Sequence, residues 1–369
     1  MGLLRLVLAL SVVAGHTRST IFGFNGLGAT YAVPVFFTIS GFYMAMILNE
    51  KYLTLPAKQF YISRALRIFP VYFIGVLLSL LVSHKEIIET FTGLSIIPKL
   101  YMVISNLTIF GSDLTTQFCF HRLDGLCEKP INLSINPPGW SLAPELMFYL
   151  SAPFVVRSIR KTAFLLSAGC IYLIIANKLN YPLHLFGVAT ERNVTFVYSF
   201  YASSIVFFTI GSLGYHLIRK KGNINYYFSV GIILLLSFTQ TTIPSWFILL
   251  LSAAIPSLFE ITKNIKIDRF IGDLSYPVYI LHFPILIFLK DIYVRNEIMS
   301  LGSAVTVITL LASIAVYFFV DKRIENFRHS DRVIDKKDGV KYYNRLGVAY
   351  VLLYALAPIL WVSLLVVNQ

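Results

Sequence analysis

Apolar segments long enough to cross a lipid bilayer recur along the whole chain, separated by short polar stretches. In hydrocarbon every backbone amide must be hydrogen-bonded internally, so repeated segments of this length fold as membrane-spanning helices. We predict about eleven spans, near residues 3–22, 31–49, 66–83, 140–157, 162–177, 194–218, 226–242, 244–261, 272–290, 300–320 and 346–367. The expected fold class is all-α, a polytopic integral membrane helical bundle with about ten to eleven transmembrane helices. It forms a single membrane-embedded domain over residues 1–369.

The composition excludes an ordinary soluble protein. Apolar residues make up 57% of the chain, charged residues make up 13%, and the mean hydropathy is +0.72. Residues 1–20 lack a small-residue cleavage site, so we predict an uncleaved first helix rather than a signal peptide. The net charge of +13 does not indicate nucleic acid, because Lys and Arg collect in the cytoplasmic loops of membrane proteins. Anionic lipid headgroups or an anionic cytosolic substrate are the expected partners.

Clusters of basic residues predict the orientation of the bundle. They lie within 51–67, 157–161, 219–221, 263–269 and 322–345, and all fall on one side if the N-terminus is cytoplasmic. We therefore predict a multi-pass protein of the bacterial inner or plasma membrane. Residues 84–139 become an extracytoplasmic loop, and 321–345 become a charged cytoplasmic linker before the last span. The outer loop holds Cys119 and Cys127, for which a disulfide is an open alternative to free thiols, and no metal site is predicted.

Two ionisable residues share one face of the first span. Arg5 and His16 are eleven residues apart, which gives about 20° of rotation and roughly 16 Å of rise along an α-helix. An ionisable side chain at membrane depth is costly, and by default it marks a pathway or a reaction site. One such group near each side of the bilayer suits chemistry carried across a membrane.

A third ionisable residue, Glu145, is predicted near the outer end of its span. It follows a helix start at Pro137–Trp140, and helical rise puts it roughly 7 Å deep, at about the depth of His16. A carboxylate there can pair with His16, fix its tautomer and raise its basicity. The alternative is a structural polar pair that holds two helices together. Trp140 suits the aromatic belt at the membrane interface.

An arginine pair and a second histidine each have both a functional and a structural interpretation. Arg64 and Arg67, at the entry of span 66–83, share a helix face and can hold phosphates or a carboxylate. Ordinary positive-inside anchoring is the alternative. His282 lies between Pro277 and Pro284 in span 272–290, where it can line a substrate path or accompany a kink.

Taken together, these residues resemble the acyltransferase 3 family of integral membrane O-acyltransferases. Five motifs match in family order: Arg5 and His16 with ten residues between them, Phe-Phe-x-Ile-Ser-Gly-Phe at 36–42, Arg-x-x-Arg-Ile-x-Pro-x-Tyr at 64–72, Trp-Ser-Leu-x-x-Glu-x-x-Phe-Tyr at 140–149, and Ser-Tyr-x-x-Tyr-x-x-His-x-Pro at 275–284. The chain departs from the family at Ile324-Glu325-Asn326, where a proline is expected after the glutamate. The first helix begins almost at Met1, and we expect no esterase-like extracytoplasmic domain in this chain.

The resemblance implies a membrane O-acyltransferase, with an O-acetyltransferase as the preferred form. It would move an acyl group from cytoplasmic acetyl-CoA, a co-substrate, to a hydroxyl of a cell-surface polysaccharide or lipid-linked glycan. No cofactor or metal is expected. With this family in view we assign catalysis to His16 and Glu145, donor binding to Arg5, Arg64 and Arg67, and acceptor binding to His282, Tyr279 and Trp140.

A transporter or flippase for a lipid-linked sugar or small anion is the alternative, since membrane-depth charges also suit a proton-coupled carrier. Inverted repeats with paired broken helices, typical of many carriers, are not found in the sequence. The sequence leaves open which sugar and acyl group are used and whether transfer is direct or through an acyl-enzyme. It also leaves open the oligomeric state, a homo-oligomer included.

Overall fold

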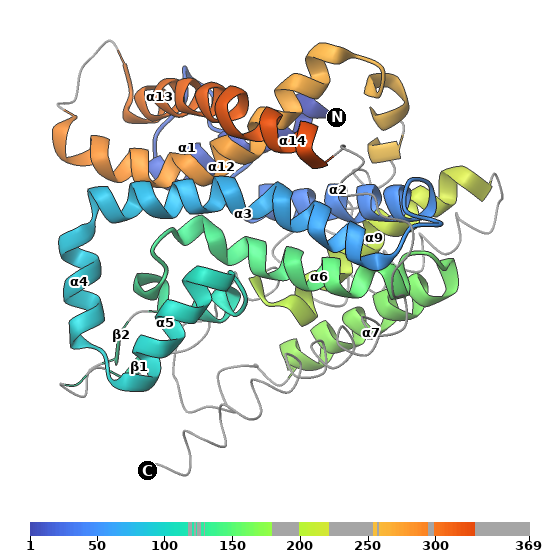
Figure 1. The fold of residues 1–369 in the computed structure, drawn as a ribbon, viewed down its shortest axis with the longest axis horizontal. Coiled ribbons are helices and arrows are strands. Elements are labelled where there is room, and N and C mark those ends of the chain that lie inside the picture. The colour runs from blue at the N-terminus through green and yellow to red at the C-terminus, as the bar shows by residue number, and fades with distance from the viewer. Residues whose placement is uncertain are drawn as a thin grey trace.

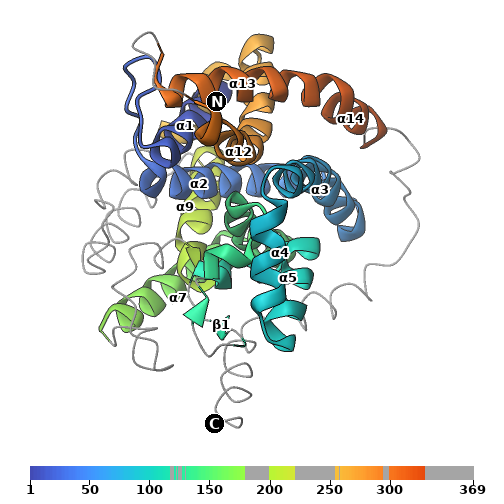
Figure 2. The same ribbon diagram turned by 90° about the vertical axis from the view of Figure 1, so that its left-hand side faces the viewer.

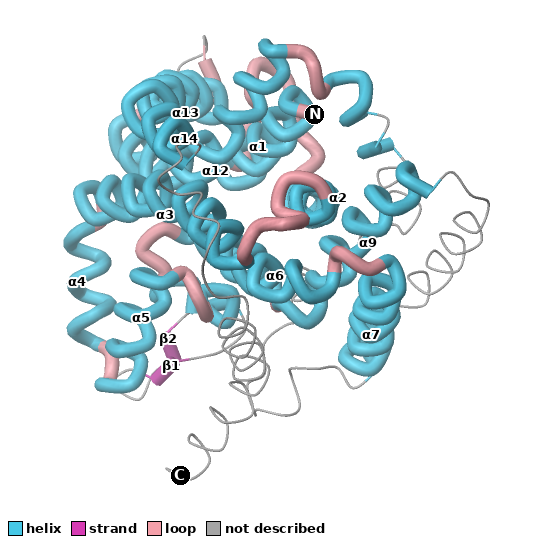
Figure 3. Tube along the Cα trace, turned by 45° about the vertical axis from the view of Figure 1, so that its right-hand side comes forward, coloured by secondary structure: helices cyan, strands magenta, loops and turns pink. Residues whose placement is uncertain are grey.

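The computed structural model describes residues 1–116, 130–178, 199–220, 258–293 and 299–328, with isolated positions within 120–128 and at 254–256. These residues are helical almost throughout (Figure 3), which confirms the predicted all-α class. The exception is a short antiparallel strand pair, β1 (Phe120–His121) and β2 (Cys127–Glu128). The predicted spans 226–242 and 346–367 and most of span 244–261 lie outside the described residues, as does Cys119, so the alternative of a disulfide with Cys127 stays open.

The described α-helices are α1 (Gly2–Thr17), α2 (Ala29–Asn49), α3 (Ala57–Val82), α4 (His84–Gly93), α5 (Ile96–Thr108), α6 (Leu142–Val155), α7 (Ile159–Lys178), α9 (Tyr201–Lys220), α12 (Lys266–Ile292), α13 (Leu301–Val316) and α14 (Lys322–Arg328). Short 3₁₀ turns η1 (Ser112–Thr116), η2 (Pro130–Leu133) and η3 (Pro137–Ser141) precede α6. A π turn, Tyr317–Asp321, joins α13 to α14.

Four helical stretches within the described residues are long and apolar enough to cross a membrane: Ala29–Asn49, Ala57–Val82, Lys266–Lys290 and Leu301–Asn326. The first helix, Gly2–Thr17, is apolar but shorter. The predicted total of ten to eleven spans therefore stays a prediction. The predicted linker 321–345 begins as helix, because the π turn and α14 extend α13 as far as Arg328.

The third span begins earlier than its apolar residues predict. Pro56 caps α3, so the helix starts at Ala57 and includes the polar stretch before residue 66. Arg64 and Arg67 consequently lie about two and three turns inside the helix, rather than at its entry. Their side chains reach the interior of the bundle, as described below.

Helices α1 and α12 run parallel and stay in contact from end to end. At one end Asp268 accepts hydrogen bonds from the backbone N–H groups of Gly2 (2.7 Å) and Leu3 (2.8 Å). At the other end His16 meets His282. A Cβ added at Gly272 would lie 2.8 Å from the Cα of Gly2, so the two backbones touch where both residues lack a side chain.

Helices α2 and α9 cross at an equally short distance. A Cβ added at Gly41 would lie 1.9 Å from the carbonyl oxygen of Phe208, and one added at Gly211 would lie 1.8 Å from that of Thr38. Ser212 donates a hydrogen bond of 2.9 Å to the carbonyl of Gly41 across the same contact. Gly41 and Gly211, which lack side chains, allow this close helix approach.

One end of the bundle is covered by α4 and α5. Figure 1 shows α4 turning away from the end of α3, and Figure 2 shows α4 and α5 together across this end. The chain then passes back into the bundle before α6, since Asn136, Pro138, Gly139 and Ser141 are all buried. Helix α6 therefore begins inside the protein and not at a membrane surface.

Asn106 of α5 fixes this returning segment. Its Nδ2 donates to the carbonyl of Leu133 (2.7 Å), and its Oδ1 accepts from the N–H of Ile135 (2.8 Å).

We expect Asn106→Ala to lower the free energy of unfolding by about 2 kcal/mol or more, because two backbone groups lose their partners. Thermal unfolding in detergent measures the change. Thr108→Ala, which removes an exposed bond within α5, is the control, and equal melting temperatures for both variants would contradict this role.

Candidate active site

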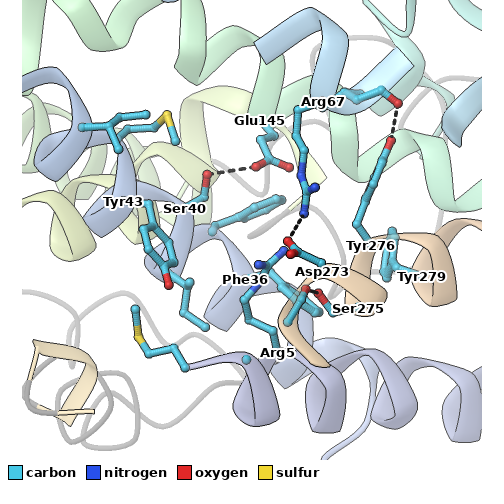
Figure 4. Close-up of a pocket in the computed structure, with 18 of the residues that line it drawn as sticks. Arg5, Phe36, Ser40, Tyr43, Arg67, Glu145, Asp273, Ser275, Tyr276 and Tyr279 are labelled. Atoms are coloured by element: carbon cyan, nitrogen blue, oxygen red, sulfur yellow. Dashed lines mark hydrogen bonds and ion pairs between the residues drawn. The ribbon is translucent and has the colours of Figure 1, made fainter. Parts of the chain in front are cut away.

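A cavity of about 520 Å³ lies between α1, α2, α3, α6 and α12 (Figure 4). This volume falls within the range of small-molecule sites. Its polar and charged lining is Arg5, Ser40, Tyr43, Arg64, Arg67, Ser141, Glu145, Tyr149, Thr262, Lys263, Asp268, Arg269, Asp273, Ser275, Tyr276 and Tyr279. The three arginines that the sequence singled out thus converge on one cavity, together with Glu145 and Tyr279.

The cavity wall carries more cationic than anionic side chains. Five are cationic, namely Arg5, Arg64, Arg67, Lys263 and Arg269, and three are carboxylates, namely Glu145, Asp268 and Asp273. The wall is therefore left with a surplus of positive charge. A low-dielectric cavity with such a surplus favours an anionic ligand.

The arginines differ in how they are paired. Arg67 donates to Asp273 in a salt bridge of 3.1 Å, with each side chain 21% exposed. Arg64 packs its guanidinium over the rings of Phe60 and Tyr149 at 5.8 and 6.0 Å. Among the described residues, neither Arg64 nor Arg5 forms a salt bridge with a carboxylate. Two half-buried guanidinium groups without a bound carboxylate can each hold a ligand anion.

Glu145 belongs to this cavity and does not meet His16. Its Oε1 accepts hydrogen bonds from Ser40 Oγ (2.9 Å) and from the hydroxyl of Tyr149. The expected pairing of Glu145 with His16 is thus not what the structure contains. Helical rise gives the depth of Glu145 only if its helix starts at the membrane surface, whereas α6 starts inside the bundle.

His16 instead faces His282, with 2.7 Å between His16 Nδ1 and His282 Nε2. The ring centroids lie 5.0 Å apart and the ring planes differ by 17°. The distance between the centroids is about the sum of the N···N distance and the two ring radii. The two nitrogens therefore lie on the line between the centroids, and the nearly coplanar rings meet edge to edge. Such alignment is the geometry of a good hydrogen bond. His16 is exposed, whereas His282 is completely buried.

Tyr279 connects the cavity to the histidine pair. Its ring lines the cavity, lies 6.0 Å from the ring of Phe36 and lies 6.1 Å from the ring of His282. Its hydroxyl shares a 2.8 Å hydrogen bond with Ser141 Oγ. The rings of Tyr279 and Phe36 contact each other at the wall of the cavity, and we call this pair the aromatic layer. Trp140, expected at the membrane interface, lies partly buried against the main core in η3.

Asp273 is a candidate site residue that the sequence did not single out. It binds Arg67, and Figure 4 shows Arg5 reaching toward it from α1. A carboxylate inside an apolar span is itself a signal of function, and this signal could have found Asp273. Ser40 and Tyr149, which hold Glu145, carry no comparable signal because hydroxyl side chains are common in membrane helices.

No three His, Cys, Asp or Glu side chains within the described part of the chain are grouped so that they could hold a metal ion. A family model whose description is "acyltransferase domain" matches residues 1–318. No curated protein and no solved structure matches the chain. The matched range contains α1 to α13, and with them every residue of the cavity and of the histidine pair.

Proposed function

The chain belongs to the acyltransferase 3 family, and from this premise we propose that it is an acyl-CoA-dependent O-acetyltransferase. The family and the apolar helices make it an integral membrane acyltransferase. The proposed acceptor is a hydroxyl of a cell-surface polysaccharide or lipid-linked glycan. The observation that carries this proposal is the cavity with three converging arginines, because acyl-CoA is an anionic donor whose phosphates need such partners.

Arg5, Arg64 and Arg67 are the proposed donor-binding residues. The basic clusters favour a cytoplasmic N-terminus, so the cavity, which Met1 and Gly2 also line, would face the cytosol where acyl-CoA is found. Asp273 fixes the guanidinium of Arg67. Glu145, held by Ser40 and Tyr149, would act on the donor side and not on His16.

His16 is the proposed catalytic residue at the acceptor side. As general base it takes the proton of the acceptor hydroxyl while the oxygen attacks the acyl carbonyl; the C–S bond breaks, and the proton ends on the thiol of CoA. As acyl carrier, its imidazole nitrogen attacks the carbonyl first, the C–S bond breaks and CoA leaves as the thiolate; the acceptor hydroxyl then attacks the acyl-imidazole, the C–N bond breaks, and the hydroxyl proton ends on the CoA thiolate. Both routes bring the thioester past the layer of Tyr279 and Phe36. Tyr279 and Trp140 are the proposed acceptor contacts.

Radiolabelled acetyl-CoA, supplied to purified protein in nanodiscs with a glycan extract, tests the proposal. We expect release of free CoA and label on glycan or protein. A transporter or flippase would move its substrate without consuming the donor. Absence of CoA release from folded protein, with acetyl, succinyl and longer acyl donors alike, would therefore contradict the enzyme assignment.

Arg64→Gln tests the donor site separately. We expect the donor KM to rise about 10-fold to 100-fold, because the donor loses one charge-assisted hydrogen bond. The folded fraction should hardly change, since Arg64 has no carboxylate partner among the described residues. Lys58→Gln is the matched control, because it removes the same charge from an exposed position of α3 that does not line the cavity. Equal KM values for the two variants would contradict donor binding by Arg64.

A further inference from the structure

Three groups on α12 and α1 are hydrogen-bonded in series, and this series determines the orientation of the His16 imidazole. His282 Nδ1 lies 2.8 Å from the carbonyl oxygen of Tyr279, and His282 Nε2 lies 2.7 Å from His16 Nδ1. Tyr279, His282 and His16 therefore form one hydrogen-bonded series. Its far end is His16 Nε2.

The carbonyl determines where the protons of this series lie. A backbone carbonyl has no proton to donate, so His282 Nδ1 must carry the hydrogen. Neutral His282 then has its lone pair on Nε2. A lone pair on that atom requires a hydrogen on His16 Nδ1. In neutral His16, Nε2 is left with the free lone pair.

A cationic His282 would reverse this assignment, since both of its nitrogens would then donate. The burial of the ring opposes that state: His282 is 0% exposed. Among the described residues no carboxylate contacts either imidazole, and their polar contacts are each other and the backbone carbonyls of Tyr279 and Val278. An unpaired buried cation is strongly disfavoured.

We infer that His282 is a positioning residue that fixes His16 as the Nδ1–H tautomer, so that Nε2 of His16 is the reactive nitrogen. The tautomer of His16 is a property of the structure, and only the reactivity of its Nε2 rests on the proposed function. It holds for both proposed routes, because a general base and an acyl carrier each need the lone pair on the nitrogen that points away from His282.

The assignment replaces acceptor binding as the role of His282. Both ring nitrogens of His282 are engaged and the ring is fully buried, so no polar atom is left for an acceptor hydroxyl. The same arrangement supports the step itself. When His16 Nε2 takes a proton, Nδ1–H becomes a stronger donor to His282, and the imidazolium is stabilised without a carboxylate.

Two amide variants separate the two contacts of His282. The oxygen of a glutamine can reach the place of Nε2 and accept from His16, whereas an asparagine places its amide near Nδ1 and leaves His16 without an acceptor. We expect His282→Gln to keep kcat within about tenfold of wild type and His282→Asn to lose about 100-fold or more. The donor KM should stay unchanged in both, since the arginines lie in the separate cavity.

The tautomer is measured directly by magic-angle-spinning NMR on protein labelled with ¹³C,¹⁵N-histidine in lipid, at about pH 8, where an ordinary histidine is neutral. The His16 signals are assigned by their loss in His16→Ala. We expect the Nδ1–H tautomer in wild type and in His282→Gln, and the Nε2–H tautomer in His282→Asn. An Nε2–H signal for His16 in wild type would overturn the inference, and so would an unchanged tautomer and rate in His282→Asn.

The wild-type spectrum is decisive even if a variant fails to fold. It is also independent of catalysis, so the two proposals can fail separately. Wild-type protein that shows the Nδ1–H tautomer but releases no CoA would contradict the proposed function and leave the tautomer assignment standing.

Discussion

Replacement of His16 by alanine should abolish acyl transfer while the protein stays folded in the membrane. His16 is exposed, so its side chain contributes little buried packing, and the loss of one hydrogen bond to His282 costs about 1 kcal/mol. The rate should fall by about 100-fold to 10,000-fold or more, the contribution of a positioned base or nucleophile. Release of CoA from labelled acetyl-CoA, normalised to protein that elutes as a single peak in detergent, measures the effect.

His84→Ala is the matched control for this experiment. His84 is the first residue of α4, is exposed, and lies away from both the cavity and the histidine pair. It should keep wild-type activity. Transfer retained in His16→Ala would remove His16 from the chemistry, and equal losses in both variants would point to a general effect on the protein.

Alanine at Gly41 should prevent the bundle from assembling. The added Cβ would lie 1.9 Å from the backbone oxygen of Phe208, and a backbone atom cannot turn aside as the end of a side chain can. Helices α2 and α9 must then separate, which breaks the bond from Ser212 to the carbonyl of Gly41 and loosens the stacked rings of Phe37 and Phe208. We expect the free energy of unfolding to fall by about 3 kcal/mol or more. A collapse of the monodisperse fraction after extraction in mild detergent would be the visible result.

Gly15→Ala makes the same chemical change where there is room. A Cβ at Gly15 would meet its nearest neighbour, the backbone nitrogen of Ala29, at 3.5 Å, an ordinary contact. Alanine also favours helix by about 1 kcal/mol over glycine. This variant should melt at or above the wild-type temperature. If Gly41→Ala melts no lower than Gly15→Ala, the close contact of α2 and α9 is not what holds this part of the bundle.

The sequence predicted the helical class, and the family motifs selected residues that converge in space. Arg5, Arg64, Arg67, Glu145 and Tyr279 come from four helices, yet all line one cavity. Periodicity and hydropathy could predict each helix, because membrane-spanning segments leave strong signals. Convergence is different: it depends on which helix faces which, and a single sequence carries no direct record of that.

The pairing of Glu145 shows why depth along a helix is a poor guide. The prolines before α6 predict the start of a helix at the membrane surface. The segment lies inside the bundle because Tyr72 packs where a Cβ of Gly139 would be and because Asn106 binds the chain at Leu133 and Ile135. These are contacts between residues about 30 to 70 positions apart, which no local pattern contains.

The layer formed by Tyr279 and Phe36 has a consequence for the energetics of the cell. In the proposed arrangement the arginine cavity opens to the cytosol and His16 lies toward the opposite face, so the two ends of the site touch different aqueous compartments. A continuous file of water between them would let protons flow down the membrane potential, which is worth about 2.3 kcal/mol per charge per 100 mV. In that arrangement the two rings, whose centroids lie 6.0 Å apart, would interrupt such a file. Passage of an acyl chain would then have to open the layer without leaving a conducting pore, so the same aromatic pair would both admit the substrate and insulate the membrane.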